Sequence, residues 1–262
     1  MTKKQANLLF WSSVGVCLVL TLFFEFFTLS VLSTPKRNFF LTKIFSLGFG
    51  WAAIALLLKR RGTGLFQKPT KILFLLPALI IAADNFPFAS YFAGKMQRTD
   101  KETLDLLLFA AYCLFTGLFE ETVFRGLLFT VLAERFEQNK NGLTKTVFVS
   151  SLVFGAAHLL NMFYGNIGGA LLQAGYSCLT GLAFAYTLIK TKNLFCCALA
   201  HGLYNFCGLF FSAEQGLGAG VVFDLPTAVT MLVVSLAVAA FAIFDYCKYT
   251  EEERRSLYER LL

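Results

Sequence analysis

One short stretch of the chain carries the residues best suited to chemistry. From Gly117 to Gly126 it reads GLFEETVFRG, which places Glu120, Glu121 and Arg125 within an apolar run long enough to span a membrane. A charged side chain at the centre of such a helix costs roughly 2.5–3.5 kcal/mol, whereas one leucine or phenylalanine returns only about 0.3–0.6 kcal/mol. We therefore expect these charges to face inward in a helix bundle, where ionisable residues usually mark a functional site.

The spacing divides this stretch into a pair and a single residue. Glu121 and Arg125 lie four apart, so a helix puts them on one face, where they can form an ion pair. Glu120 points about 100° away from that face. We expect Arg125 to neutralise and orient Glu121, while Glu120 takes part in the chemistry. The alternative is a buried structural ion triad, because buried ion pairs also fix the register of helices.

The two histidines of the chain extend this set. His158 follows Phe154 by four residues and His201 precedes Asn205 by four, all within apolar segments. Four-residue spacing places each pair on one helix face. A single histidine on an apolar face is usually a core residue. Two histidines together with a diglutamate in such segments favour one shared polar site.

These residue types suit the activation of water. A carboxylate in a water-poor pocket can act as a general base near neutral pH. A neutral histidine can hold the same water or protonate a leaving amine. A second histidine and an asparagine amide can donate hydrogen bonds to a developing oxyanion, often contributing about 3 kcal/mol. No serine or cysteine stands out as an activated nucleophile, so the residues favour attack by water on an amide.

Taken in order, the motifs Glu-Glu-x-x-x-Arg, Phe-x-x-x-His and His-x-x-x-Asn resemble those of the CPBP family of intramembrane proteases. That family includes the type II CAAX prenyl endopeptidases and bacterial bacteriocin-processing and self-immunity proteins. The motifs run from Glu120 to Asn205, and every motif position is filled. The resemblance implies an eight-span helical core with a site that opens towards the cytosol. It also implies that Glu120 and His158 activate water, and that His201 and Asn205 form the oxyanion hole.

The same resemblance bears on the remaining motif residues and on cofactors. Glu121 and Arg125 fill the other motif positions and look like structural supports. The family is often labelled metalloprotease, and catalytic zinc centres typically use three protein ligands, which Glu120, His158 and His201 would supply. The sequence lacks His-Glu-x-x-His, and what is known of the family's fold favours a metal-free glutamate mechanism. We therefore expect no metal and no cofactor, with zinc as the alternative.

Composition sets the class of protein. Of the 262 residues, 57% are hydrophobic and 15% are charged, whereas a soluble domain has about 25% charged residues. This predicts an all-α, polytopic membrane protein whose partners are the lipid bilayer and a peptide or membrane-anchored protein substrate, not nucleic acid. The seven cysteines lie mostly in apolar segments without Cys-x-x-Cys spacing, which is typical of small apolar packing residues.

Hydrophobicity predicts eight transmembrane helices in a single membrane domain, residues 1–262, with a motif-bearing core at about 104–211. The third predicted span carries Asp84, Asn85 and Pro87, which is typical of a proline-kinked helix. The expected spans are residues 8–32, 39–58, 72–92, 104–136, 143–160, 167–189, 194–211 and 226–246.

The C-terminal tail, residues 248–262, has the pattern of a short interfacial helix. Thr250 and Glu253 have the spacing of a capping box. Glu251 can pair with Arg255. An apolar face would come from Leu257, Leu261 and Leu262.

Connecting segments rich in lysine and arginine usually lie in the cytoplasm. Connections 161–166 and 212–225 hold neither residue, although the early outer connections carry Lys36, Arg37, Lys95, Arg98 and Lys101. We expect a multi-pass protein of a prokaryotic plasma membrane with both termini cytoplasmic. On that arrangement the inner connections hold Lys59, Arg60, Arg61, Lys68, Lys71, Arg135, Lys140, Lys145, Lys190 and Lys192.

Three functions fit these residues. The first is an intramembrane endopeptidase that hydrolyses a peptide bond of a membrane-associated protein or peptide. The second is a non-enzymatic immunity or binding protein that sequesters a peptide toxin. The third is a proton-coupled transporter in which the glutamates and histidines relay protons. No repeat-related pair of broken helices, the usual sign of a transporter, is visible in the sequence.

Overall fold

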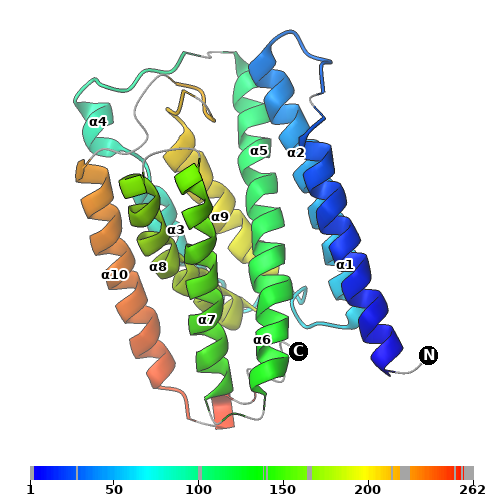
Figure 1. Cartoon of the computed structure of the whole chain (residues 1–262). Coiled ribbons are helices and arrows are strands. Elements are labelled where there is room, and N and C mark those ends of the chain that lie inside the picture. The colour runs from blue at the N-terminus through cyan, green and yellow to red at the C-terminus, as the bar shows by residue number, and fades with distance from the viewer. Residues whose placement is uncertain are drawn as a thin grey trace.

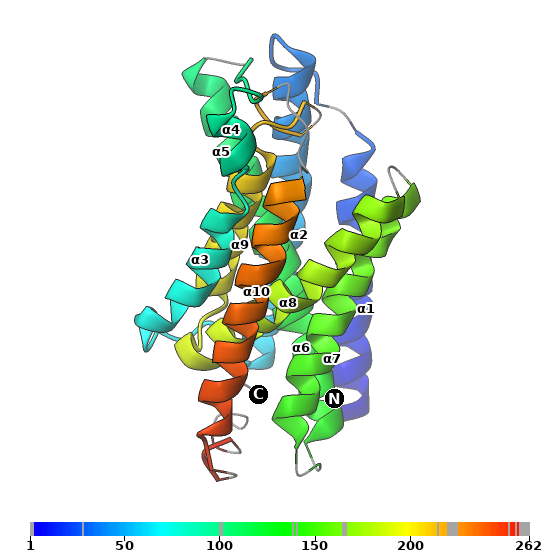
Figure 2. The same ribbon diagram turned by 90° about the vertical axis from the view of Figure 1, so that its left-hand side faces the viewer.

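The fold was analysed in a computed structural model of the chain, and it is a bundle of roughly antiparallel helices (Figures 1 and 2). The structure describes residues 3–27, 29–99, 102–137, 139, 141–163, 167–213, 215–218, 225–250, 252–254 and 256. This confirms the predicted all-helical membrane bundle, since no strand occurs within these ranges. The helices are α1 (Lys3–Glu25), α2 (Pro35–Arg61), α3 (Leu76–Asp84), α4 (Phe88–Phe92), α5 (Thr103–Glu121), α6 (Phe129–Phe136), α7 (Gly142–Ala157), α8 (Ile167–Thr191), α9 (Leu194–Leu209) and α10 (Leu225–Cys247).

Six helical segments in the described part of the chain are long and apolar enough to cross a membrane, and two apolar helices are shorter. The shorter ones are Ile72–Asp84 and Leu194–Leu209. The predicted number of eight is reached only when both are included. A helix of the length of α9 extends for about 24 Å, less than the hydrocarbon core of about 30 Å, and α9 packs between α3 and α5.

The third predicted span, residues 72–92, is not one helix. A 3-10 turn at Ile72–Leu75 leads into α3, which ends at Asp84, and the short α4 follows. Pro87 has φ −76° and ψ 65°, outside the helical region. The Asn85 amide donates to the carbonyl of Tyr204 on α9 at 2.9 Å. The expected kink was therefore wrong, because Asn85 fastens the end of α3 to a neighbouring helix and does not cap a continuous one.

The helix that carries the charged stretch is continuous from Thr103 to Phe136, as expected, but it is not α-helical throughout. Residues Thr122–Leu128 form a π-helix between α5 and α6. A π-helix bonds each N–H to the carbonyl five residues back, and short π segments inside α-helices often occur at functional sites. Spacing and hydrophobicity gave no sign of this change in winding.

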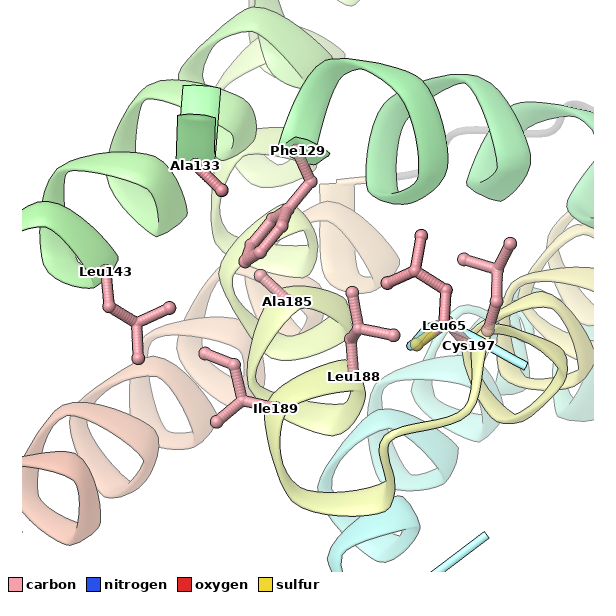
Figure 3. Close-up of a cluster of buried hydrophobic side chains, with 9 residues drawn as sticks. Leu65, Phe129, Ala133, Leu143, Ala185, Leu188, Ile189 and Cys197 are labelled. Carbon is pink, nitrogen blue, oxygen red and sulfur yellow. The ribbon is translucent and has the colours of Figure 1, made fainter. Parts of the chain in front are cut away.

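A cluster of buried apolar residues joins α6, α7, α8 and α9 on the side of the bundle where the chain termini lie (Figures 1 and 3). It includes one residue from the α2–α3 connection, Leu65, so that connection is also held against the bundle. Burial of each large apolar side chain contributes about 1.5–3 kcal/mol. This packing holds α6, α7, α8 and α9 together at that end of the bundle. The cluster comprises Leu65, Phe129, Ala133, Leu143, Ala185, Leu188, Ile189, Leu194 and Cys197.

Ion pairs fasten helix ends at both sides of the bundle. At the start of α2, Arg37 Nε lies 2.5 Å from Asp105 Oδ1 near the start of α5, and Arg37 also pairs with Glu102. At the opposite end, Lys190 of α8 pairs with Asp245 of α10. These contacts tie α2 to α5 and α8 to α10.

The capping box predicted for the tail is present. The Thr250 N–H donates to Glu253 Oε2 at 2.8 Å, and the Glu253 N–H donates to Thr250 Oγ1 at 3.2 Å. These bonds hold the pKa of Glu253 below its usual value. The expected Glu251–Arg255 pair and the apolar residues Leu257, Leu261 and Leu262 lie outside the described residues.

Candidate active site

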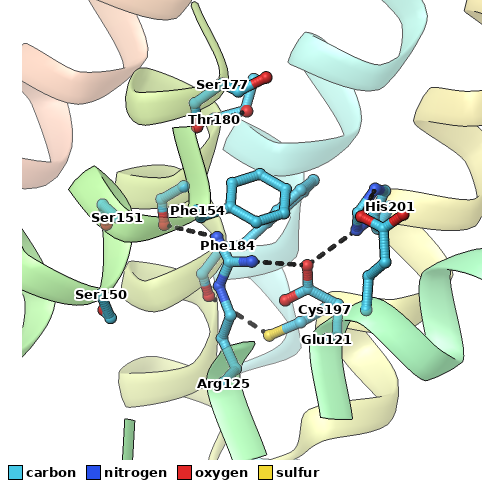
Figure 4. A network of polar contacts seen from close by, with 12 residues as sticks. Glu121, Arg125, Ser150, Ser151, Phe154, Ser177, Thr180, Phe184, Cys197 and His201 are labelled. Atoms are coloured by element: carbon cyan, nitrogen blue, oxygen red, sulfur yellow. Dashed lines mark hydrogen bonds and ion pairs between the residues drawn. The ribbon is translucent and has the colours of Figure 1, made fainter. Parts of the chain in front are cut away.

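The carboxylate of Glu121 joins two of the three motifs. Its Oε1 atom accepts from Arg125 Nη1 at 2.8 Å and lies 2.8 Å from His201 Nδ1 (Figure 4). Glu121 and Arg125 are both fully buried. Arg125 also donates through Nη2 to the carbonyl of Gly181 on α8, at 3.2 Å. The predicted pairing of Glu121 with Arg125 is thus present, and the contact to His201 adds a partner from α9.

Two phenylalanines enclose the guanidinium of Arg125. Its central carbon lies 4.2 Å from the ring centroid of Phe154 and 5.4 Å from that of Phe184. Such cation–π contacts stabilise a desolvated guanidinium by about 2 kcal/mol. Phe184 also stacks on His201, with centroids 5.2 Å apart and planes at 21°. The Phe-x-x-x-His spacing marked Phe154, whereas no pattern in the sequence marked Phe184.

Glu120 faces away from this buried pair. Its side chain is 31% exposed, and its Oε2 lies 3.6 Å from Nε2 of His201. That separation is too long for a direct hydrogen bond, but a water or a substrate atom can bridge it. The two glutamates therefore differ as predicted: Glu121 is bonded within the protein, and Glu120 lines a cavity.

The hydrogen bonds of the histidines restrict which nitrogen carries a proton. His158 Nδ1 lies 2.8 Å from the carbonyl of Phe154, which can only accept, so Nδ1 is the donor. In His201, Nδ1 likewise donates to the Glu121 carboxylate. In each ring Nε2 is the nitrogen left for other partners, and in His201 it is the one nearer to Glu120.

A cavity of about 400 Å³ brings the predicted catalytic residues together. Glu120 from α5, His158 from the end of α7, and His201 and Asn205 from α9 all line it. Glu121 and Arg125 are not among its lining residues. Four residues from three separate motifs thus share one space inside the bundle, and the other two lie behind its wall.

The approach of α5 to α9 depends on glycine. A Cβ atom at Gly117 would lie 2.6 Å from the carbonyl oxygen of Ala198 and 2.7 Å from the backbone nitrogen of Gly202. Neither contact is possible without a shift of backbone. Small residues allow such close packing of membrane helices, and here they bring His201 within reach of Glu121.

The outer part of the cavity lies at the end of the bundle away from the termini. Asn161 lies in the 3-10 segment after α7, Gln173 near the start of α8, and Gln215 in the connection after α9. In Figures 1 and 2 these helix ends lie opposite the start of α1 and the end of α10. We expected both a site that opens to the cytosol and cytoplasmic termini. Because the outer part of the cavity and the termini lie at opposite ends of the bundle, these two expectations cannot both be correct.

The zinc alternative receives no support from the arrangement of donors. Within the described ranges, no group of three or more His, Cys, Asp or Glu side chains is placed to hold a metal ion. The Nδ1 atoms of His158 and His201 donate to Phe154 and Glu121, which leaves each Nε2 facing other partners, an arrangement that metal-binding histidines also show. The metal-free site therefore stays a prediction.

Comparison with known proteins agrees with the motifs. A family model described as type II CAAX prenyl endopeptidase Rce1-like matches residues 102–207. This range contains all three motifs, and it confirms the resemblance to the CPBP proteases. No curated protein and no solved structure matches the chain.

Proposed function

We propose that the protein is an intramembrane endopeptidase that hydrolyses a peptide bond of a membrane-associated protein or peptide. The match to a protease family over residues 102–207 supports a hydrolase, and the long apolar helices support an integral, multi-pass membrane protein. The observation that carries the proposal is that Glu120, His158, His201 and Asn205 line one cavity inside the bundle.

Glu120 acts as the general base. It is a carboxylate on the cavity wall, part exposed and not bound to Arg125. As the water oxygen attacks the carbonyl carbon of the substrate, one water proton passes to Glu120. His158 helps to hold that water through Nε2, because its Nδ1 is committed to the Phe154 carbonyl. The proton then passes to the amine nitrogen when the carbon–nitrogen bond breaks.

His201 and Asn205 stabilise the negative oxygen of the tetrahedral intermediate. His201 Nδ1 donates to Glu121, so its Nε2 donates to the oxyanion only when the ring carries both protons. The carboxylates of Glu120 and Glu121 lie 3.6 Å and 2.8 Å from Nε2 and Nδ1 of this ring. An oxyanion donor of this kind contributes about 2.7–4 kcal/mol to the transition state.

We propose that both termini lie in the cytoplasm of a prokaryote. The end of the bundle that holds the termini also holds the α2–α3, α6–α7 and α8–α9 connections (Figure 1). Part of the positive charge at the other end is held in the protein, because Arg37 is buried and paired with Asp105 and Glu102. The described residues of the three connections and the adjoining helix ends supply Lys59, Arg60, Arg61, Lys68, Lys71, Arg135 and Lys192.

A comparison of peptides from cells that express the wild type, an active-site variant and a control variant tests the enzyme proposal. Cells that express the wild type are compared with cells that express Glu120→Gln, and uncleaved precursors are scored by mass spectrometry. We expect at least one membrane-associated polypeptide to accumulate uncut in the variant. Glu137→Gln, an exposed glutamate beyond α6, is the matched control and should resemble the wild type. Identical peptide profiles in all three would contradict a protease and favour a binding protein.

A further inference from the structure

The part of α9 that carries Asn205 is held by a residue from outside the three motifs. Asn85, which directly follows α3, donates through its side-chain amide to the carbonyl oxygen of Tyr204 at 2.9 Å. That carbonyl belongs to the peptide unit that joins Tyr204 to Asn205, and the atoms of a peptide unit, including both Cα atoms, lie close to one plane. The bond therefore acts directly on the backbone position of Asn205. Asn85 itself lies outside residues 102–207, the range that the family model matches.

Gly208 makes room for this amide on α9. A Cβ atom at Gly208 would lie 2.8 Å from Cγ and 3.0 Å from Oδ1 of Asn85, and it would overlap Nδ2. The amide thus fills the space that a side chain at position 208 would take. Gly208 does not have the positive φ of a glycine that ends a helix, and glycine inside a helix is less stable than alanine. The contact with Asn85 gives a physical reason for glycine at this position.

The contact lies on the face of α9 that carries the proposed oxyanion donors. His201, Asn205 and Gly208 follow one another at intervals of four and three residues, so they lie along one helix face. All three line the cavity, and so does Asn85, which is only 8% exposed. The Asn85 amide is therefore part of the cavity wall, about one helical turn from Asn205.

α3 gives Asn85 a firm support, whereas the end of α9 needs one. Ala78 of α3 belongs to a buried cluster with Phe184 of α8 and Ala200 of α9, so α3 is seated on both helices. α9 ends only four residues after Asn205. The last carbonyl groups of a helix have no partner within the helix, and helix ends fray. A bond from the buried end of α3 counters that fraying where Asn205 is placed.

We infer that Asn85 is a positioning residue for the proposed reaction, because it holds the Tyr204–Asn205 peptide unit so that the Asn205 amide is aimed at the oxyanion. This inference rests on the proposed function and adds a residue to it. Oxyanion donors act most strongly when they are oriented before the reaction begins, and a displacement of about 1 Å can lower a rate by about 10²-fold. Loss of the bond should therefore lower kcat by about 10–10²-fold with little change in KM.

Removal of the donor tests the inference. The values of kcat and KM for a membrane-tethered reporter peptide are measured for the wild type, Asn85→Ala and Leu79→Ala. Leu79 is a partly buried residue of α3 that packs against the same cluster as Ala78, so its truncation loosens α3 without removing the amide. Both variants should have lower melting temperatures, but only Asn85→Ala should lose kcat. Equal losses of kcat in the two variants would overturn the inference, since general loosening of α3 would then explain the effect.

A double-mutant cycle tests whether Asn85 acts through Asn205. Asn205→Ala has no amide to aim, so adding Asn85→Ala to it should cause no further fall in kcat. A further fall by the same factor as in the single variant would overturn the inference, because Asn85 would then act independently of Asn205. A raised KM with unchanged kcat in Asn85→Ala would also overturn it and would assign Asn85 to substrate binding.

Gly208→Ala tests the same contact from α9 and serves if Asn85→Ala does not fold. The added methyl would displace the Asn85 amide, while alanine favours the helix, so kcat should fall although α9 itself is not weakened. Gly175→Ala, whose methyl would meet nothing within 4 Å, is the control. Wild-type kcat in Gly208→Ala would overturn the inference and leave the protease proposal standing. If Glu120→Gln cleaves the reporter as fast as the wild type, the proposed function fails and the inference fails with it.

Discussion

Glu121 and His201 stand 80 positions apart in the chain, yet Oε1 of one lies 2.8 Å from Nδ1 of the other. The same carboxylate oxygen accepts from Arg125. One buried acid thus fixes both a cation and the orientation of a histidine ring. This leaves Nε2 of His201 on the side of Glu120, so the two adjacent glutamates have separate tasks, one in support and one at the cavity.

The support role of Arg125 predicts a loss of stability when it is removed. Arg125→Ala would leave Glu121 buried without its cation, at a cost of about 3–5 kcal/mol. We expect a lowered melting temperature in detergent together with lost activity. Arg61→Ala is the control, because its pair with Glu134 lies at a partly exposed helix end, where such a pair contributes about 0–1 kcal/mol. A fully stable but inactive Arg125→Ala would point to a direct role in the reaction.

Close contact of α5 with α9 predicts that Gly117→Ala impairs the enzyme. The added methyl would meet the backbone at Ala198 and Gly202, which should separate the helices at a cost of about 1–3 kcal/mol and weaken the His201–Glu121 contact. Melting temperature and cleavage rate should both fall. Gly175→Ala on α8 meets nothing within 4 Å and should be neutral or stabilising. Equal behaviour of the two variants would show that the glycine contact is unimportant.

Much of this arrangement was accessible from the sequence, and the missing parts have physical causes. Spacing predicted the Glu121–Arg125 pair, because four residues place two side chains on one helix face. It missed the π-helix at 122–128, since spacing shows which side chains share a helix face and does not show how the backbone is wound. It also predicted a kinked helix at 72–92, because Pro87 alone does not reveal that Asn85 bonds to another helix.

Activity should survive strict removal of metal ions. This prediction rests on the donors, since no group of three or more His, Cys, Asp or Glu side chains is placed to hold a metal ion in the described ranges. Cleavage of a reporter peptide is measured before and after treatment with a zinc chelator. Stoichiometric zinc in the purified protein, with activity lost on chelation and restored by zinc, would contradict the metal-free reaction.

The proposed orientation predicts the outcome of reporter fusions. Fusions after Arg61 and after Asn193, at the end of the bundle that holds the termini, should give a cytoplasmic signal. A fusion after Gly216, in the connection beyond α9, should give an external signal. The opposite pattern would place the mouth of the cavity in the cytosol and contradict the proposed orientation of the termini.

Replacing Glu120 by glutamine tests the central claim most directly. Glutamine keeps the shape and the hydrogen bonding of the side chain, but its amide cannot accept a proton usefully at neutral pH. The melting temperature should hold or rise, because a charge inside the bundle is removed, and a bound substrate should still co-purify.

The decisive measurement is the rate at which purified Glu120→Gln cleaves a membrane-tethered reporter peptide, compared with the wild type and with Glu137→Gln. Loss of a positioned general base predicts a fall of about 10²–10⁴-fold for Glu120→Gln, and no change for Glu137→Gln. Cleavage by Glu120→Gln at the wild-type rate would show that Glu120 is not the base and would contradict the proposed mechanism.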